Sequence, residues 1–204
     1  MATYESTSEL EAVNTILSAI GEAPVNSITG TLPIDATQAL SLLKEISRET
    51  QSWGWHFNSF YDYTLSLDTD SKIPLATNIM RVDLNINKYS PTTYNIIKRG
   101  GFLFNKKDNT YTFDKALDAE VILFLPFDEL PENARRYITI RAARIFQDRL
   151  LGANTLHGFG IVDEQNAMAA LKQEEMDTAD HSIFNNLDSY RIISRTDNTD
   201  SNLS

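Results

Sequence analysis

The chain has 204 residues, of which 42% are hydrophobic and 10% aromatic, enough to fill the core of one medium domain or two small ones. It contains no cysteine, which excludes disulfides, thiolate metal sites and a thiol nucleophile. The formal net charge of −10 repels phosphate backbones and argues against tight, sequence-independent binding of nucleic acid over the surface.

The amino-terminal segment is polar and acidic, unlike a signal peptide, and no apolar stretch approaches the roughly 18 to 20 residues of a membrane span. We therefore expect a soluble chain that is made in a cytoplasm. Charge is unevenly distributed, because arginines gather in residues 135–149 and acidic residues in 163–180. Segments of opposite charge are expected to pack side by side, within one subunit or between subunits.

Two amphipathic helices are predicted in the first quarter of the chain. Ser8 and Glu11 have the spacing of a capping box, and Gly21 is expected to end the first helix in the left-handed conformation. Asp35 is the predicted N-cap of a second, longer helix that ends at Gly54.

Residues 55–127 are rich in Tyr, Phe, Ile, Thr and Asn, a composition that favours strands. Gly100-Gly101 permits the positive φ values of a tight hairpin. The candidate strands are residues 61–67, 80–86, 94–98, 102–105, 111–113 and 120–125.

Two further helices are predicted towards the carboxyl end of the chain. Pro131 suits the first turn of a third helix, which Gly152 is expected to end. After a glycine-containing loop, residues 161–179 form a weaker helical pattern, and the chain then turns polar.

The predicted fold class is α+β, with a helical bundle formed by the N- and C-terminal helices and an inserted antiparallel β domain. The bundle is expected to comprise residues 1–54 and 128–180, the β domain residues 55–127, and an extended C-terminal arm residues 181–204.

Motifs for catalysis or cofactor binding are absent from the sequence. Gly100-Gly101 has neither dinucleotide nor P-loop spacing, and His56, His157 and His181 are isolated. We therefore expect no catalytic residue, no metal and no cofactor. Trp53 to Phe57 is distinctive, and this segment is expected to pack in the core where the two domains meet, with a partner-binding patch as the alternative.

Carboxylates near aromatic residues keep a second function open. Asp62, Asp68, Asp128 and Glu129 could line a sugar site, so a carbohydrate-active hydrolase that acts on envelope polysaccharide is the alternative function. A small monomeric binding module is a third hypothesis.

Four segments, taken in order, resemble the tail tubular protein A family of short-tailed bacteriophages. The matching motifs are Ile20-Gly21-Glu22-Ala23-Pro24-Val25, Trp53-Gly54-Trp55-His56-Phe57-Asn58, Arg99-Gly100-Gly101-Phe102 and Phe127-Asp128-Glu129-Leu130-Pro131. The resemblance covers nearly the whole chain. It implies a non-enzymatic structural protein of the virion tail, made in the host cytoplasm.

The resemblance also implies partners. They are further copies of the chain in a dodecameric ring, the portal protein, the tail nozzle protein (tail tubular protein B) and, as a further candidate, the tail fibre, with DNA passing through the lumen without specific binding. Opposite faces of each subunit are expected to meet in a ring that closes by rotation.

Two sets of interface residues are expected. Arg135, Arg141 and Arg144 would meet an acidic helix of the neighbouring subunit, or would pair inside one subunit. Apolar residues of the arm would bind the portal, namely Phe184, Leu187, Tyr190 and Ile192.

Overall fold

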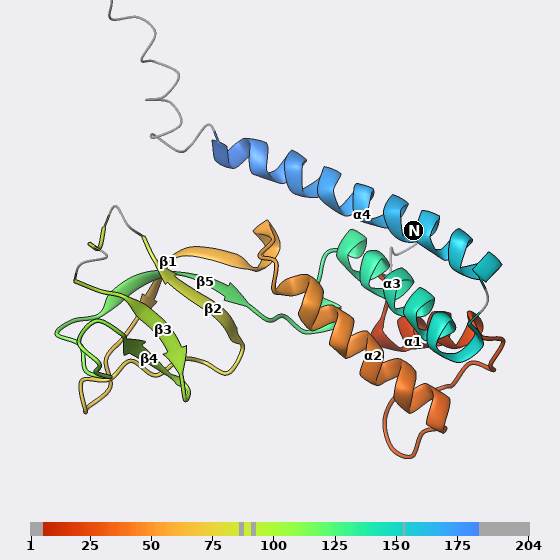
Figure 1. The fold of residues 1–204 in the computed structure, drawn as a ribbon, viewed down its shortest axis with the longest axis horizontal. Coiled ribbons are helices and arrows are strands. Elements are labelled where there is room, and N and C mark those ends of the chain that lie inside the picture. The colour runs from red at the N-terminus through yellow and green to blue at the C-terminus, as the bar shows by residue number, and fades with distance from the viewer. Residues whose placement is uncertain (1–5, 86–87, 91–92, 153, 184–204) are drawn as a thin grey trace, which may run out of the picture.

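The computed structural model describes residues 6–85, 88–90, 93–152 and 154–183, which form a helical part and a β part (Figure 1). The helices are α1 (Glu9–Ser18), α2 (Ile34–Gln51), α3 (Glu132–Leu151) and α4 (Asn154–Ile183), with the short 3-10 helices η1 (His56–Asn58) and η2 (Phe127–Glu129). The strands are β1 (Ser59–Leu65), β2 (Ile79–Leu84), β3 (Ile96–Arg99), β4 (Phe102–Asn105) and β5 (Leu117–Leu123). The predicted α+β fold with terminal helices is confirmed.

Helix α1 begins and ends as its sequence predicts. The Ser8 hydroxyl accepts a hydrogen bond from the Glu11 amide at 3.2 Å, and the Glu11 carboxylate accepts one from the Ser8 amide at 2.7 Å. The hydrogen bonds that the Ser8 amide and hydroxyl donate to this carboxylate lower the pKa of Glu11. After the helix, Gly21 adopts a φ of +81°, and the Glu22 amide donates to the Leu17 carbonyl at 3.1 Å. The capping box and the glycine stop are confirmed.

Prolines cap the amino-terminal ends of α2 and α3. Pro33, not the predicted Asp35, is the N-cap of α2, and Pro131 is the N-cap of α3 rather than a residue of its first turn. The Pro33 carbonyl accepts the first helical hydrogen bond of α2 from Thr37 at 3.0 Å. Asp35 lies in the first turn instead, where its charge is favourable to the helix dipole.

Helix α4 starts earlier than predicted, at Asn154 rather than near residue 161. The expected glycine-containing loop is wrong, because Gly158 and Gly160 lie inside the helix. A Cβ on Gly160 would be 3.0 Å from the Arg144 side chain, so the glycine allows α4 to approach α3 closely. This packing compensates for the helix-weakening tendency of glycine, which costs roughly 1 kcal/mol relative to alanine.

The β part consists of a three-stranded sheet in the order β1-β5-β2 and a β3-β4 hairpin, all antiparallel. Gly100 and Gly101, with φ values of +59° and +81°, make the hairpin turn as predicted. The predicted strand at residues 111–113 is wrong. Thr112 forms only an isolated bridge to Lys72, and the Phe113 amide donates to the Ser71 carbonyl. The Phe113 side chain is buried, so this segment lies as a loop over the core.

Each part has its own buried apolar cluster. The helical cluster draws on α1, α2, α3 and α4 and on residues such as Trp55 and Phe127 beside them, whereas the β cluster draws on the strands and on Ile73, Leu75 and Phe113. Figure 1 shows the strands on one side and the helices on the other. Within the described ranges, no helix combines the length and hydrophobicity needed to cross a membrane. The domain boundaries stay a prediction.

Two buried amide side chains connect the helical part to the sheet. Gln51, at the end of α2, donates to the Leu125 carbonyl at 3.0 Å and accepts from the Leu125 amide at 2.8 Å. Asn58 donates to the Gln51 carbonyl at 2.9 Å and the Leu123 carbonyl at 3.0 Å, and accepts from the Trp55 amide at 2.8 Å. Both amides are fully buried and bind the outgoing and the returning chain together.

Replacing Asn58 with alanine should therefore lower the free energy of unfolding by about 2 to 3 kcal/mol, because buried backbone groups lose their partners. Urea denaturation followed by circular dichroism measures this loss. Ser52→Ala, an exposed change in the same turn, is the matched control and should stay within about 0.5 kcal/mol. Equal stability of Asn58→Ala and the unmodified chain would contradict the role assigned to this residue.

Candidate functional site

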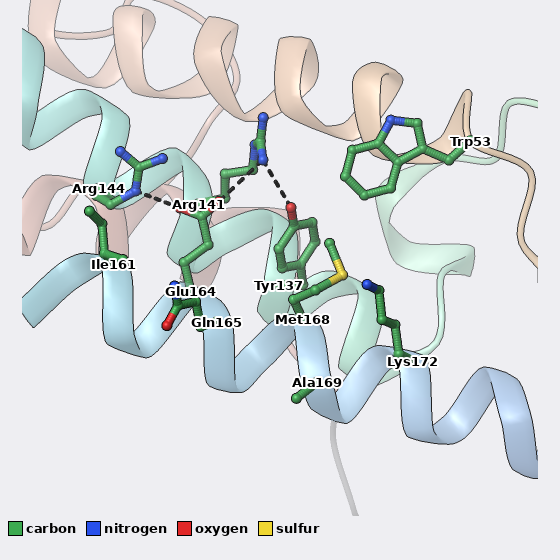
Figure 2. A pocket seen from close by; sticks show the side chains of 10 residues that line it. All are labelled: Trp53, Tyr137, Arg141, Arg144, Ile161, Glu164, Gln165, Met168, Ala169 and Lys172. Atoms are coloured by element: carbon green, nitrogen blue, oxygen red, sulfur yellow. Dashed lines mark hydrogen bonds and ion pairs between the residues drawn. The ribbon is translucent and has the colours of Figure 1, made fainter.

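An open hollow lies between α3, α4 and the turn that follows α2 (Figure 2). It has a volume of about 500 Å³ and is called the α3–α4 groove below. Its lining residues are Trp53, Tyr137, Arg141, Arg144, Ile161, Glu164, Gln165, Met168, Ala169 and Lys172. Those on α3 and α4 recur at helical spacings of three and four residues, which places them on the facing sides of the two helices.

A network of charges forms one wall of the groove (Figure 2). Glu164 of α4 accepts hydrogen bonds from both Arg141 and Arg144 of α3. Arg141 also donates to the Tyr137 hydroxyl at 3.0 Å and pairs with Glu49 of α2 at 2.7 Å. Glu164 thus ties α4 to α3, and Arg141 links both helices to α2.

Arg141 and Tyr137 keep their protonation states near neutral pH. Burial alone would lower the pKa of Arg141, but Tyr137, Glu49 and Glu164 outweigh it and raise that pKa. Burial raises the pKa of Tyr137, so its hydroxyl stays protonated. Groups with such stable protonation states are poor general acids or bases. The wall is therefore suited to holding helices together rather than to proton transfer.

The rest of the groove is open to solvent and mostly apolar, with Gln165 and Lys172 as its polar side chains. The Trp53 indole is 45% exposed, although its ring lies 6.0 Å from the Trp55 ring and 6.3 Å from the Tyr137 ring. Across from it lie Met168 and the exposed Lys172 of α4. An apolar hollow with a few polar groups at its rim is typical of a binding surface.

The two tryptophans of residues 53–57 lie in different environments. Trp55 is buried, stacks on Phe57 with ring centres 6.4 Å apart, and donates its indole hydrogen to the Thr50 carbonyl at 2.8 Å. Trp53 faces the groove instead. Core packing, as expected from the sequence, holds for Trp55, whereas a partner-binding patch at Trp53 stays a prediction.

The predicted arginines do not act as one group. Arg135 is buried and donates to the backbone carbonyls of Leu130, Asp128 and Thr7, so it holds the chain around the start of α3. Arg141 and Arg144 are brought together by Glu164, which belongs to the acidic segment of the same chain. Their contact with a neighbouring subunit stays a prediction.

The four predicted arm residues lie outside the described residues. They are Phe184, Leu187, Tyr190 and Ile192. Helix α4 continues to Ile183, so the first residues that we assigned to the arm are helical.

Three of the four carboxylates considered for sugar hydrolysis have structural partners, namely Asp62, Asp68 and Asp128. Asp62 pairs with Lys88 at 2.9 Å, and Asp68 accepts backbone hydrogen bonds from Asp70 and Lys72 within its turn. Asp128 accepts from the Glu9 amide at 3.3 Å. In the part of the chain that the structure describes, no cluster of three or more His, Cys, Asp or Glu could hold a metal ion. None of these contacts favours a hydrolase.

Comparison with known proteins identifies the same family as the motifs. The family model described as tail tubular protein matches residues 10–181. The chain is also similar to tail tubular protein A of Klebsiella phage KP34, with 26% identity over 166 residues, which is 81% of this chain and 86% of that protein. The family match thus spans the bundle, the sheet and the groove.

Replacing Glu164 with alanine should lower the free energy of unfolding by about 2 kcal/mol, because two largely buried guanidinium groups lose their shared carboxylate. Amide hydrogen exchange should quicken in α4 more than in α1. Asp163→Ala, an exposed change one residue away, is the control and should shift stability by no more than about 0.5 kcal/mol. Unchanged exchange in α4 would show that Glu164 does not hold this helix.

Proposed function

Because this chain belongs to the tail tubular protein family, we propose that it forms the adaptor ring between the portal and the tail nozzle of a short-tailed phage. The observation that carries the proposal is the family match over residues 10–181. Membership of the family directly supports a structural role in the phage tail. The position in the ring and the partners are what we add.

The ring would be built from copies of this chain, with twelve copies as the expected number. Each subunit would present different surfaces to its two neighbours, a heterologous contact that closes by rotation. A bundle whose helices are tied together by Glu164, Arg141 and Arg144 supports this role, because a ring subunit must hold its own shape while neighbours bind both sides.

The lumen of the ring would conduct DNA without holding it. With a net charge of −10, the chain can neutralise few phosphates across its surface as a whole. Weak electrostatic attraction lets a duplex slide, whereas a basic channel would retain it. We therefore propose a conduit with no sequence-specific contacts to DNA.

Portal, nozzle protein and tail fibre are the proposed partners outside the ring. Residues 181–204, the proposed arm, carry the four apolar side chains assigned to portal binding, Phe184, Leu187, Tyr190 and Ile192. A polar segment with a few apolar side chains is suited to becoming ordered on a partner. The role needs no catalysis, in keeping with the fixed charges of the α3–α4 groove.

Native mass spectrometry of the purified full chain, alone and mixed with the portal protein of the same phage, tests the proposal. We expect closed oligomers of the 23.0 kDa chain, with or without portal, and a complex that contains both proteins. A chain that remains monomeric and does not bind portal would overturn the proposed ring.

A further inference from the structure

We propose that the outer face of the β3–β4 hairpin, with the turn that follows it, contacts the phosphate backbone of duplex DNA. This surface is called the hairpin face. The inference rests on the proposed DNA conduit and specifies which surface of a subunit meets the duplex. The residues of the hairpin face are Ile97, Arg99, Phe104, Lys106 and Lys107.

The hairpin region is net positive in an acidic chain. Residues 96–115 hold five basic residues and two acidic ones, although the whole chain has a net charge of −10. Neutral groups bind both carboxylates, because Asp108 accepts from the Asn105 side-chain amide at 2.9 Å and Asp114 accepts from the Tyr94 hydroxyl at 2.6 Å. Basic residues that gather on one surface of a protein are typical of a site for an anionic partner.

The five cations of this region have no carboxylate within ion-pair distance among the described residues. Lys98 donates to the Ile79 carbonyl instead, and the Lys115 ammonium lies 5.9 Å from the centre of the Tyr89 ring. The other three cations are exposed and supply the charge of the hairpin face, namely Arg99, Lys106 and Lys107.

Strand alternation determines which side chains form the hairpin face. Leu103 and Asn105 of β4 are buried beneath the hairpin, so Phe104 and Lys106 point to its other side. Phe104 belongs to neither of the two apolar clusters, as expected for an outward side chain. Ile97 is the partner of Phe104 across the hairpin and is 39% exposed.

The Arg99 side chain is held in place by an aromatic ring. Its guanidinium lies 4.9 Å from the centre of the Phe104 ring, and the Tyr111 ring meets Phe104 edge-on at 4.8 Å. A stacked guanidinium uses its flat face and keeps the N–H donors at its edge available, and these donors bind phosphate oxygens. Arg99 is therefore preorganised to bind an anion.

Acidic residues of the adjoining loop are already engaged. This loop reaches the hairpin region through the bridge between Lys72 and Thr112. Asp70 pairs with Lys72 at 3.3 Å, and Asp68 accepts backbone hydrogen bonds within its own turn. Figure 1 shows β3 and β4 in the β part, apart from the acidic helix α4. The cations of the hairpin face thus stay available to a partner.

The composition of the hairpin face favours DNA over an acidic protein surface. Interfaces between proteins are depleted in lysine and centre on apolar side chains, whereas this face has two exposed lysines and only Ile97 as an exposed apolar group. Lysine and arginine supply many of the contacts to DNA phosphates, which carry no sequence information. A few such contacts hold a duplex weakly, in agreement with a conduit through which DNA slides.

Fluorescence anisotropy of a short labelled duplex, titrated with the full chain at several KCl concentrations, tests the contact. If three cations neutralise phosphates, the logarithm of the affinity should fall with the logarithm of the salt concentration with a slope of about −2.7 for each bound subunit. Lys106→Gln combined with Lys107→Gln should reduce this slope to about −0.9, because Arg99 alone remains. Duplexes of unrelated sequence should bind equally well.

The matched control is Arg136→Gln combined with Lys172→Gln. Both residues are exposed cations of the helical part that lack a carboxylate within ion-pair distance in the described ranges. This double variant loses the same charge, yet its slope should equal that of the unmodified chain. Equal losses in the two double variants would show that overall charge acts, and would contradict the inference. Thermal unfolding should confirm that both variants fold.

A photo-cross-linker locates the contact directly, because the chain contains no cysteine. Ile97→Cys, labelled with a thiol-reactive aryl azide, should cross-link to the duplex on irradiation. Met176→Cys with the same label is the control, since Met176 is 56% exposed on α4. Cross-linking that is absent at residue 97, or no stronger there than at residue 176, would overturn the assignment.

Native mass spectrometry of the same proteins separates this inference from the proposed ring. Rings of a chain that does not bind the duplex at low salt would overturn the DNA contact and leave the ring standing. A monomeric chain without portal binding, but with the slope that depends on the hairpin lysines, would overturn the ring and leave the contact. Loss of oligomers in the hairpin variant with unchanged DNA binding would show that the hairpin face meets another protein, and would overturn the inference.

Discussion

The arrangement of this molecule depends on how the chain leaves the helical bundle and returns to it. Gln51 and Asn58 meet that constraint, because their buried amides hydrogen-bond the segment leaving α2 and the segment returning from β5. A buried amide without hydrogen-bond partners costs free energy of folding. Few other alignments of the outgoing and the returning segment would therefore be stable. The same turn buries Trp55 and leaves Trp53 at the surface. The junction thereby shapes the groove.

Opposite charges within one chain hold the outer helix in place. The basic α3 and the acidic part of α4 meet through Glu164, which binds Arg141 and Arg144 at once. These ion pairs hold α4 against α3. In the proposed ring they would keep a subunit in shape while its neighbours bind.

Local rules predicted the elements whose ends depend on nearby residues. The capping box at Ser8 and the left-handed Gly152 needed no knowledge of the rest of the chain. The start of α4 could not be predicted, because local rules count Gly158 and Gly160 as helix-weakening, and only the packed structure shows that Gly160 lets α4 lie close to Arg144. At the groove, the clustering of arginines is visible in the sequence. That Glu164 pairs with Arg141 and Arg144, and that Trp53 is exposed, depends on tertiary packing and could not be predicted.

A reconstruction of the intact virion tail by electron cryo-microscopy tests the central claim most directly. We predict a closed ring of this chain between portal and nozzle. Density for the chain elsewhere in the virion, or a single unpaired copy, would contradict the claim that it is a ring-forming structural subunit.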